Sequence, residues 1–264
     1  GASWKTVRWD GSRLAEYIPC RELLLGDSFV WSLDPVPLPS CLRVLRLGHA
    51  YDRELPPNAL PTSLQTLSMG FRFNKPLLPG VLPSSLTDLQ LGDCFNQPLA
   101  SESLPSGLQR LSFGRQFNHP LHPGILPPSL LWLRLGSCFD QLLMPGSLPD
   151  GLHSLEFAAP PKAADPSYDQ PLPPAVLPKG LRSLVLSPAF NQEQLALPYG
   201  VTRLVFGAGF RRPLLPGTLS PCLVSLILGD GFAGPIASGV LPHGLRELRM
   251  GSSYDEPIPA GALP

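Results

Sequence analysis

Histidine and cysteine are the residue types in this sequence best suited to hold a metal or act as a nucleophile, and both are sparse. The chain has five histidines, and only His119 and His122 lie close together along it. A pair of histidines binds a metal when one regular element directs both rings to the same side. Prolines at 120 and 123 predict a loop here. The sequence therefore predicts no metal site.

The motifs of common catalytic sites are also missing from the sequence. It contains no Cys-x-x-Cys, no His-Glu-x-x-His, no phosphate-binding loop and no Gly-x-Ser-x-Gly. Each of these motifs fixes a nucleophile, a metal or a phosphate by its local backbone geometry. Without such a motif or a cluster of ligands, we expect no enzymatic activity, no cofactor and no small-molecule substrate.

The five cysteines indicate a reducing environment. Cys94 and Cys138 occupy one position of a sequence repeat two units apart, and Cys41 and Cys222 share another position eight units apart. At about 5 Å per strand, the closer pair lies about 10 Å apart, which exceeds the ~7 Å between Cα atoms that a disulfide tolerates. We interpret all five, Cys20 included, as free thiols, and expect an intracellular, cytoplasmic location.

Composition argues against two classes of partner. The chain has 20 basic and 20 acidic residues, and charged residues make up only 15% of it. Nucleic acids and anionic membranes both require a basic surface, so we expect neither as a partner. No apolar run approaches the ~18 residues of a membrane-spanning helix. Because the sequence begins at Gly1 without Met, removal of a targeting segment is an alternative that the sequence leaves open.

A repeat of about 22 residues organises the chain. Its 35 prolines and 25 glycines would indicate disorder if they had no period. An alignment on Leu-Pro instead gives units that start at Leu38, Leu60, Leu82, Leu104, Leu126, Leu148, Leu177, Leu197, Leu219 and Leu241. We predict about ten units over residues 38–264, with an expanded unit at 148–176. Residues 1–37 are predicted to form an N-terminal cap with a degenerate first repeat.

Each position of the unit has a physical interpretation. Residues Leu86–Leu91 follow L-x-x-L-x-L, whose last two leucines alternate as in a strand. Gly92 then suits a sharp turn, which a positive φ would explain. Phe95 is expected to return to the core, and Asn96 to bond backbone groups of the turn or of the neighbouring coil. Stacked units therefore predict one parallel sheet with a leucine ladder and an aromatic ladder.

The segment after the strand carries a resemblance to a known family. Its clearest copies are Phe73-Asn74-x-Pro76, Phe95-Asn96-x-Pro98 and Phe117-Asn118-x-Pro120. Each copy follows Leu-Pro-x-x-Leu-x-x-Leu-x-Leu/Phe/Met-Gly, and with these motifs the chain resembles the FNIP-repeat family, a branch of the leucine-rich repeats. The resemblance implies a curved or twisted solenoid with short strands on both faces, which serves as an interaction module.

We therefore predict an all-β or mostly β leucine-rich-repeat solenoid. Its parallel sheet is built from the L-x-x-L-x-L strands, with short second strands or extended segments on the return side and little or no helix. Some units depart from the family pattern, since Asp52, Asp140 and Asp255 stand in place of Asn, and Arg211 and Ala233 replace it later. We expect the later coils to be less regular.

The outward strand positions are the candidate binding surface. Between the last two ladder residues the chain places, unit by unit, Arg46, Ser68, Gln90, Ser112, Arg134, Glu156, Val185, Val205, Ile227 and Arg249. The three consecutive apolar residues predict an exposed stripe between Glu156 and Arg249. Trp132, on the neighbouring column, is unusual for a solvated face, and Trp and Arg are frequent in interface hot spots. We predict protein contacts at Trp132, Arg134, Glu156, Val185, Val205, Ile227 and Arg249.

Two alternatives to a binding stripe stay open. β-Branched residues favour strands whatever their role, and a loop could cover them. A second candidate contact is the insertion Ala158–Ser167, with Pro160, Pro161 and Lys162 at its centre. Insertions in repeats often carry binding function, although a merely tolerated insertion would have the same composition.

The sequence thus predicts a non-enzymatic scaffold that binds a protein partner. One alternative is a structural spacer or subunit of a larger assembly. Another is a recognition module attached to a catalytic or adaptor domain outside this sequence, which ends at Pro264 with no evident cap.

Overall fold

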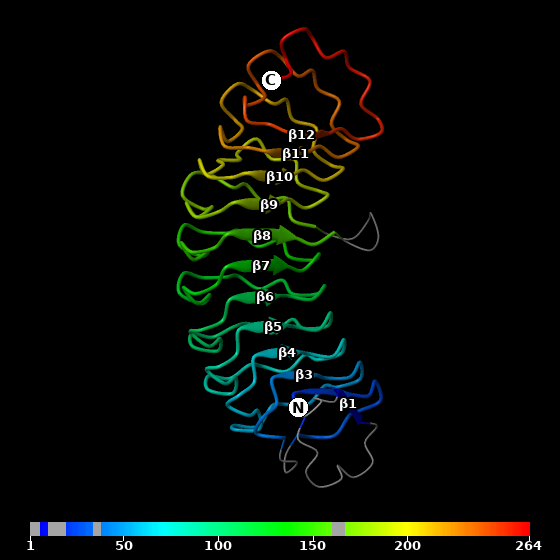
Figure 1. The fold of residues 1–264 in the computed structure, drawn as a ribbon, viewed down its shortest axis with the longest axis vertical. Helices are drawn as coiled ribbons and strands as arrows, with labels where there is room; N and C mark the ends of the chain where they lie inside the picture. The colour runs from blue at the N-terminus through cyan, green and yellow to red at the C-terminus, as the bar shows by residue number, and fades with distance from the viewer. Residues whose placement is uncertain (1–5, 10–19, 34–37, 160–166) are drawn as a thin grey trace, which may run out of the picture.

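The computed structural model describes residues 6–9, 20–33, 38–159 and 167–264. It is a single elongated stack in which each coil adds one strand to a 12-stranded parallel sheet (Figure 1). The strands follow one another in chain order: β1 (Thr6–Trp9), β2 (Glu22–Leu25), β3 (Val44–Arg46), β4 (Thr66–Ser68), β5 (Asp88–Gln90), β6 (Arg110–Ser112), β7 (Trp132–Leu135), β8 (Ser154–Phe157), β9 (Ser183–Val185), β10 (Arg203–Val205), β11 (Ser225–Ile227) and β12 (Glu247–Arg249).

The sequence period sets the strand register. Leu67, Leu89, Leu111 and Leu133 are paired from β4 to β7, so equivalent positions of successive units lie side by side. All four leucines are fully buried. The outward residues on either side of each leucine are therefore also aligned in columns, as the L-x-x-L-x-L pattern predicts.

The return side of the solenoid is extended. The described residues form no helix, and outside the named strands they make one isolated bridge, between Leu172 and Leu195. Proline lacks a backbone donor and disfavours helix, which explains why these segments form neither helices nor a second ladder of paired strands. The predicted all-β solenoid is confirmed, and the return side takes the extended form. The short strands that the family resemblance implied on both faces reduce there to this bridge.

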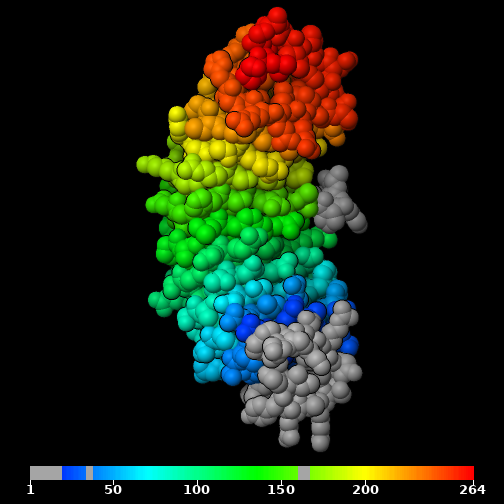
Figure 2. Space-filling view, in the orientation of Figure 1, coloured from blue at the N-terminus to red at the C-terminus, as the bar shows by residue number. Residues whose placement is uncertain are grey.

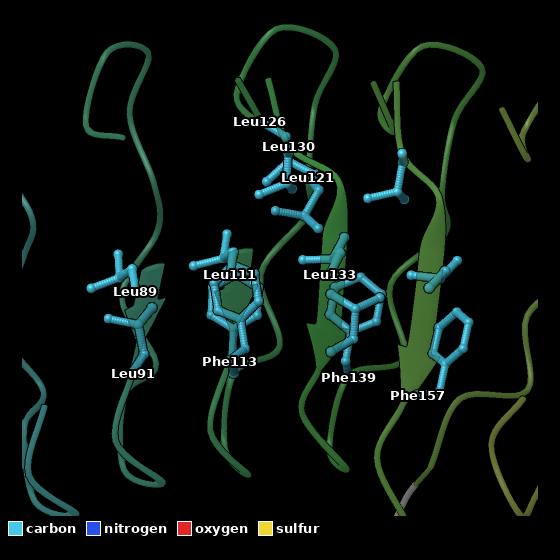
Figure 3. Close-up of a cluster of buried hydrophobic side chains, with 14 of the residues drawn as sticks. Leu89, Leu91, Leu111, Phe113, Leu121, Leu126, Leu130, Leu133, Phe139 and Phe157 are labelled. Atoms are coloured by element: carbon cyan, nitrogen blue, oxygen red, sulfur yellow. The ribbon is translucent and has the colours of Figure 1, made fainter. Parts of the chain in front are cut away.

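The core lies between the sheet and the return segments. Leu89, Leu111 and Leu133 lie at equivalent places on three successive coils, with Phe139 on the coil of Leu133 and Phe157 on the next one (Figure 3). The space-filling view shows the coils following one another as continuous bands along the molecule (Figure 2).

Stacked rings form the second ladder. Neighbouring centroids are 6.0 to 6.4 Å apart along Phe29, Tyr51, Phe73, Phe95, Phe117, Phe139, Tyr168 and Phe190, and again along Phe210, Phe232 and Tyr254. Tyr168 was not predicted as a member, because the expanded unit displaces it from the 22-residue spacing. Burial raises the pKa of Tyr51 to about 12, and its hydroxyl has no hydrogen-bond partner. The ring, and not the hydroxyl, therefore stabilises this position.

The glycines that end the strands are required for close backbone approach. A Cβ at Gly92 would lie 1.8 Å from the carbonyl oxygen of Gly70, and one at Gly114 would lie 2.0 Å from that of Gly92. The positive φ that we considered for these turns is wrong. Positive φ occurs instead at return-side glycines such as Gly80 and Gly124. Successive turns stack backbone on backbone, so no side chain fits between them.

The expanded unit breaks this glycine column. Ala158 stands where glycine is usual, and its amide donates to the Leu135 oxygen at 3.0 Å, which extends the strand pairing. The next unit has Ser187, which is buried and hydrogen-bonded to Ser167 at 2.5 Å. Tyr168, the residue after Ser167, stacks on Phe139 and continues the ring ladder.

A ladder of asparagine and aspartate side chains links the coils. Each Oδ1 accepts the backbone N–H of the equivalent residue in the next coil, at 2.8 to 3.1 Å, in the order Asp52, Asn74, Asn96, Asn118, Asp140, Asp169 and Asn191; the last donor is the Arg211 amide. The predicted bond to the neighbouring coil is confirmed. Aspartate replaces asparagine freely because the position needs only an acceptor.

We expect Asn118→Ala to lower the free energy of unfolding by about 1–2 kcal/mol. Asn118 Oδ1 accepts two hydrogen bonds at 3.0 Å, from the Asp140 amide and from Gln141 Nε2, and alanine leaves both donors unpaired. Asn118→Asp retains the acceptor and should stay within about 0.5 kcal/mol of wild type. Urea denaturation of the three proteins measures the difference. Equal losses in both variants would show that the side-chain oxygen does not support the stack.

Candidate protein-binding face of the sheet

Two columns of side chains cover the outward face of the sheet. The first column holds the first residue of each strand from β3 to β12, namely Val44, Thr66, Asp88, Arg110, Trp132, Ser154, Ser183, Arg203, Ser225 and Glu247. The second column lies two residues further along each strand and contains the residues from Arg46 to Arg249 that the sequence singled out. The strand register places neighbours of each column side by side.

From β4 to β8 most polar side chains of this face have partners on the same face. Ser68 Oγ donates to Gln90 Oε1 at 3.1 Å, and Arg110 Nε lies 3.3 Å from Asp88 Oδ2. The Arg110 guanidinium also lies 4.8 Å from the ring centroid of Trp132. Polar groups that already have partners offer a ligand little unless those contacts are exchanged.

Three residues predicted as contacts lie in this self-paired region. Trp132 is half-buried and covered on one side by Arg110. Arg134 Nε lies 3.3 Å from Glu156 Oε1, across adjacent strands, as an ion pair without hydrogen-bond geometry. The pair is partly exposed, so its contribution to stability is small. The structure brings all three side chains to one face, and their role in binding stays a prediction.

The three apolar residues form a continuous patch. Val185 is paired with Val205, and Val205 with Ile227, in strands β9 to β11. We call these three residues the apolar stripe. Each remains partly exposed, so no described loop covers them. Glu156 and Arg249 lie in register at the two ends, as predicted.

Arg203 is the residue of this face that sequence reasoning did not single out. It precedes Val205 by two residues and lies in the first column, exposed, between Ser183 and Ser225. The signal was present in the sequence, since the predicted columns place an arginine between two serines with no acid beside it.

An open pocket of about 250 Å³ lies at the carboxyl ends of β5 to β8. Its lining includes Asp93, Arg115, Arg134 and Ala158. Ala158 and Ala159 begin the insertion predicted as a second contact element, so the pocket is beside that element. Pro160, Pro161 and Lys162 lie outside the described residues, and nothing further follows for them.

The residues considered for chemistry have structural contacts. The Nε2 atom of His119 lies 3.1 Å from the Asn96 oxygen, in the link between coils. Among the described residues, no three His, Cys, Asp or Glu side chains gather as metal ligands. The five cysteines are free thiols, and Cys41 Sγ donates to the Cys20 oxygen at 3.3 Å. The described residues also contain no helix long and apolar enough to cross a membrane.

A parallel sheet with stacked leucine and aromatic ladders defines a leucine-rich-repeat solenoid. The chain belongs to the FNIP-repeat family: the FNIP Repeat pattern matches residues 51–94, 73–116, 95–138, 117–158, 168–209 and 210–253. These matches cover more than half of the chain, and they confirm the family that the sequence motifs indicated. A search of curated proteins found no match.

Two solved structures show the same architecture. CroV588, described as a novel circular LRR protein, is 28% identical, and the match covers 90% of this chain and 41% of that chain with a TM-score of 0.73. TLR13, solved in complex with ssRNA13, is 16% identical, with coverages of 87% and 39% and a TM-score of 0.58. The second likeness shows the fold alone. This chain spans less than half the length of either protein.

Proposed function

We propose that the chain is a protein-recognition scaffold whose partner contacts the apolar stripe. The observation that carries this proposal is the alignment of Val185, Val205 and Ile227 on three adjacent strands. From β4 to β8 the face is mostly polar, with Trp132 under Arg110, and its polar groups are mostly paired with one another. Binding a partner requires no catalytic group at the site, which agrees with the FNIP repeats of this chain. We also propose a reducing, intracellular location, which the five free cysteines support.

The stripe alone is too small to account for a tight complex. Fully burying a Val or Ile side chain contributes roughly 1.5–3 kcal/mol, and these three are already partly buried. Covering what remains therefore offers roughly 3 kcal/mol in all. A micromolar complex needs about 8 kcal/mol. A specific partner must also use the polar groups around the stripe.

The test is affinity capture from a native lysate with the wild type and the double variant Val205→Asp/Ile227→Asp. A carboxylate on the stripe would be desolvated by an apolar partner, so we expect at least about a tenfold loss of one captured protein. Ser68→Asp is the matched control, because Ser68 occupies the same column on β4 with similar exposure. It should capture that protein at wild-type level.

The unfolding midpoint of each variant must first match that of the wild type. Identical capture by wild type and double variant would reject the stripe as the contact surface. The insertion, with Pro160, Pro161 and Lys162, would then be the next candidate. A chain that tolerates every single-patch change but fails when a repeat is deleted would be a structural spacer instead.

A further inference from the structure

The outward arginines of the sheet differ in whether a carboxylate lies beside them. In the ten strands from β3 to β12, five arginines occupy outward positions, and four of them lie within 3.5 Å of a carboxylate oxygen: Arg46 near Glu22, Arg110 near Asp88, Arg134 near Glu156 and Arg249 near Glu247. Arg203 is the fifth. Among the described residues it has neither an ion pair nor a side-chain hydrogen bond, although it is exposed.

The neighbours of Arg203 explain why it forms no ion pair with the described residues. Its register partners on β9 and β11 are Ser183 and Ser225, which are neutral. Arg203 acts electrostatically on Glu247, which lies two strands away on β12. That carboxylate already accepts Ser225 Oγ at 2.6 Å and lies 2.7 Å from Arg249 Nε. Ser225 and then Arg249 are the main causes that lower the pKa of Glu247, and Arg203 is the smallest.

The surrounding surface is positive. On the outward positions of β9 to β12 and on the residue before each strand, four arginines stand against one glutamate: Arg182, Arg203, Arg246 and Arg249 against Glu247. The whole chain has a formal net charge of zero. This excess is therefore local to β9–β12, since the next strand, β8, carries Glu156, which is paired with Arg134.

We propose that this face binds an extended acidic peptide segment of a partner protein, with a carboxylate on Arg203 and apolar side chains on the apolar stripe. The inference rests on the proposed function and names its partner chemistry. Arg203 and Val205 are two residues apart on one strand, which is about 7 Å. A guanidinium accepts a carboxylate in a two-point geometry. Asp or Glu close to Val, Ile or Leu in the partner would fit both features at once.

The face also contains the polar contribution that the stripe lacks. A hydrogen-bonded carboxylate on a partly desolvated guanidinium is stronger than a neutral contact. Because Arg203 loses no internal ion pair on binding, the interaction requires no exchange of partners. An equivalent contact at Arg110 would have to displace Asp88 and the Trp132 ring.

The test is selection of a displayed library of random 12-residue peptides on the immobilised full chain. We expect selected peptides to combine Asp or Glu with Val, Ile or Leu. As synthetic peptides they should bind at least tenfold more weakly to Arg203→Glu than to wild type, and more weakly as salt is raised. Arg110→Gln is the matched control, in the same column but already paired, and it should bind them as the wild type does.

Other outcomes would overturn the inference in distinct ways. Selected peptides that are apolar without acidic bias, and that lose binding with Val205→Asp but not with Arg203→Glu, would reject the acidic partner and retain the proposed function. Peptides indifferent to both changes, or no enrichment at all, would reject both. Salt-sensitive binding of a fluorescent oligouridylate that depends on Arg203, in place of peptide binding, would reassign the face to single-stranded RNA.

Discussion

Gly92→Ala is expected to lower the free energy of unfolding by about 3 kcal/mol. The added Cβ would lie 1.8 Å from the carbonyl oxygen and 2.9 Å from the carbonyl carbon of Gly70. Both are backbone atoms, so no rotamer change can make room, and the two coils must separate. Thermal and urea unfolding followed by circular dichroism would measure the loss.

Gly124→Ala is the matched control, because Gly124 lies in a return-side turn with φ of 85° and nothing within 4 Å of an added Cβ. Only the left-handed backbone opposes alanine there, at a cost of about 1–2 kcal/mol. If the Gly124 variant were the less stable of the two, positive φ and not close stacking would be the main demand on glycine in this fold.

These glycines show where sequence reasoning reached its limit. The 22-residue period, the L-x-x-L-x-L spacing and the prolines that disfavour helix predict the parallel sheet, its register, the leucine ladder and most of the aromatic ladder. The period could not distinguish a glycine required by φ from one required by close approach, because both leave the same residue in the sequence. Only the distance to the previous coil separates the two causes.

Tyr168 shows a second limit. A repeat alignment locates ladder residues by counting, and the expanded unit makes the count fail between Phe139 and Tyr168. Physical continuity was preserved none the less, since those rings are 6.0 Å apart. The insertion begins at Ala158, which stands where most units have the glycine that ends the strand. The ladder therefore continues through a unit in which the sequence pattern is interrupted.

Only part of the candidate site could be predicted from the sequence. Columns follow from register, so the adjacency of Val185, Val205 and Ile227 could be derived from the sequence and is present in the structure. Side-chain pairing depends on rotamers and distances, which register alone does not give. The contacts of Arg110 with Asp88 and Trp132 therefore follow only from the structure. The same holds for Arg203, which has no ion pair among the described residues.

Phe95→Ala is expected to be the most destabilising of the side-chain truncations, at about 3–5 kcal/mol. Phe95 is fully buried and stacks on Phe73 and Phe117 at 6.1 Å on either side. Its loss therefore leaves a cavity shared by three coils. Phe71→Ala is the matched control, since Phe71 is 44% exposed and stacks on His49 at the surface. It should cost less than about 1 kcal/mol.

The position of the damage tests how the solenoid is held together. In a stack, each coil contacts only its neighbours, so stability is the sum of local and nearest-neighbour terms. Hydrogen exchange of Phe95→Ala should lose protection first in β4 to β6, while β10 and β11 keep theirs. Uniform loss along all strands would mean that the coils unfold as one unit. In that case the cost of a buried cavity would be distributed over the whole sheet rather than over the two interfaces that contain Phe95.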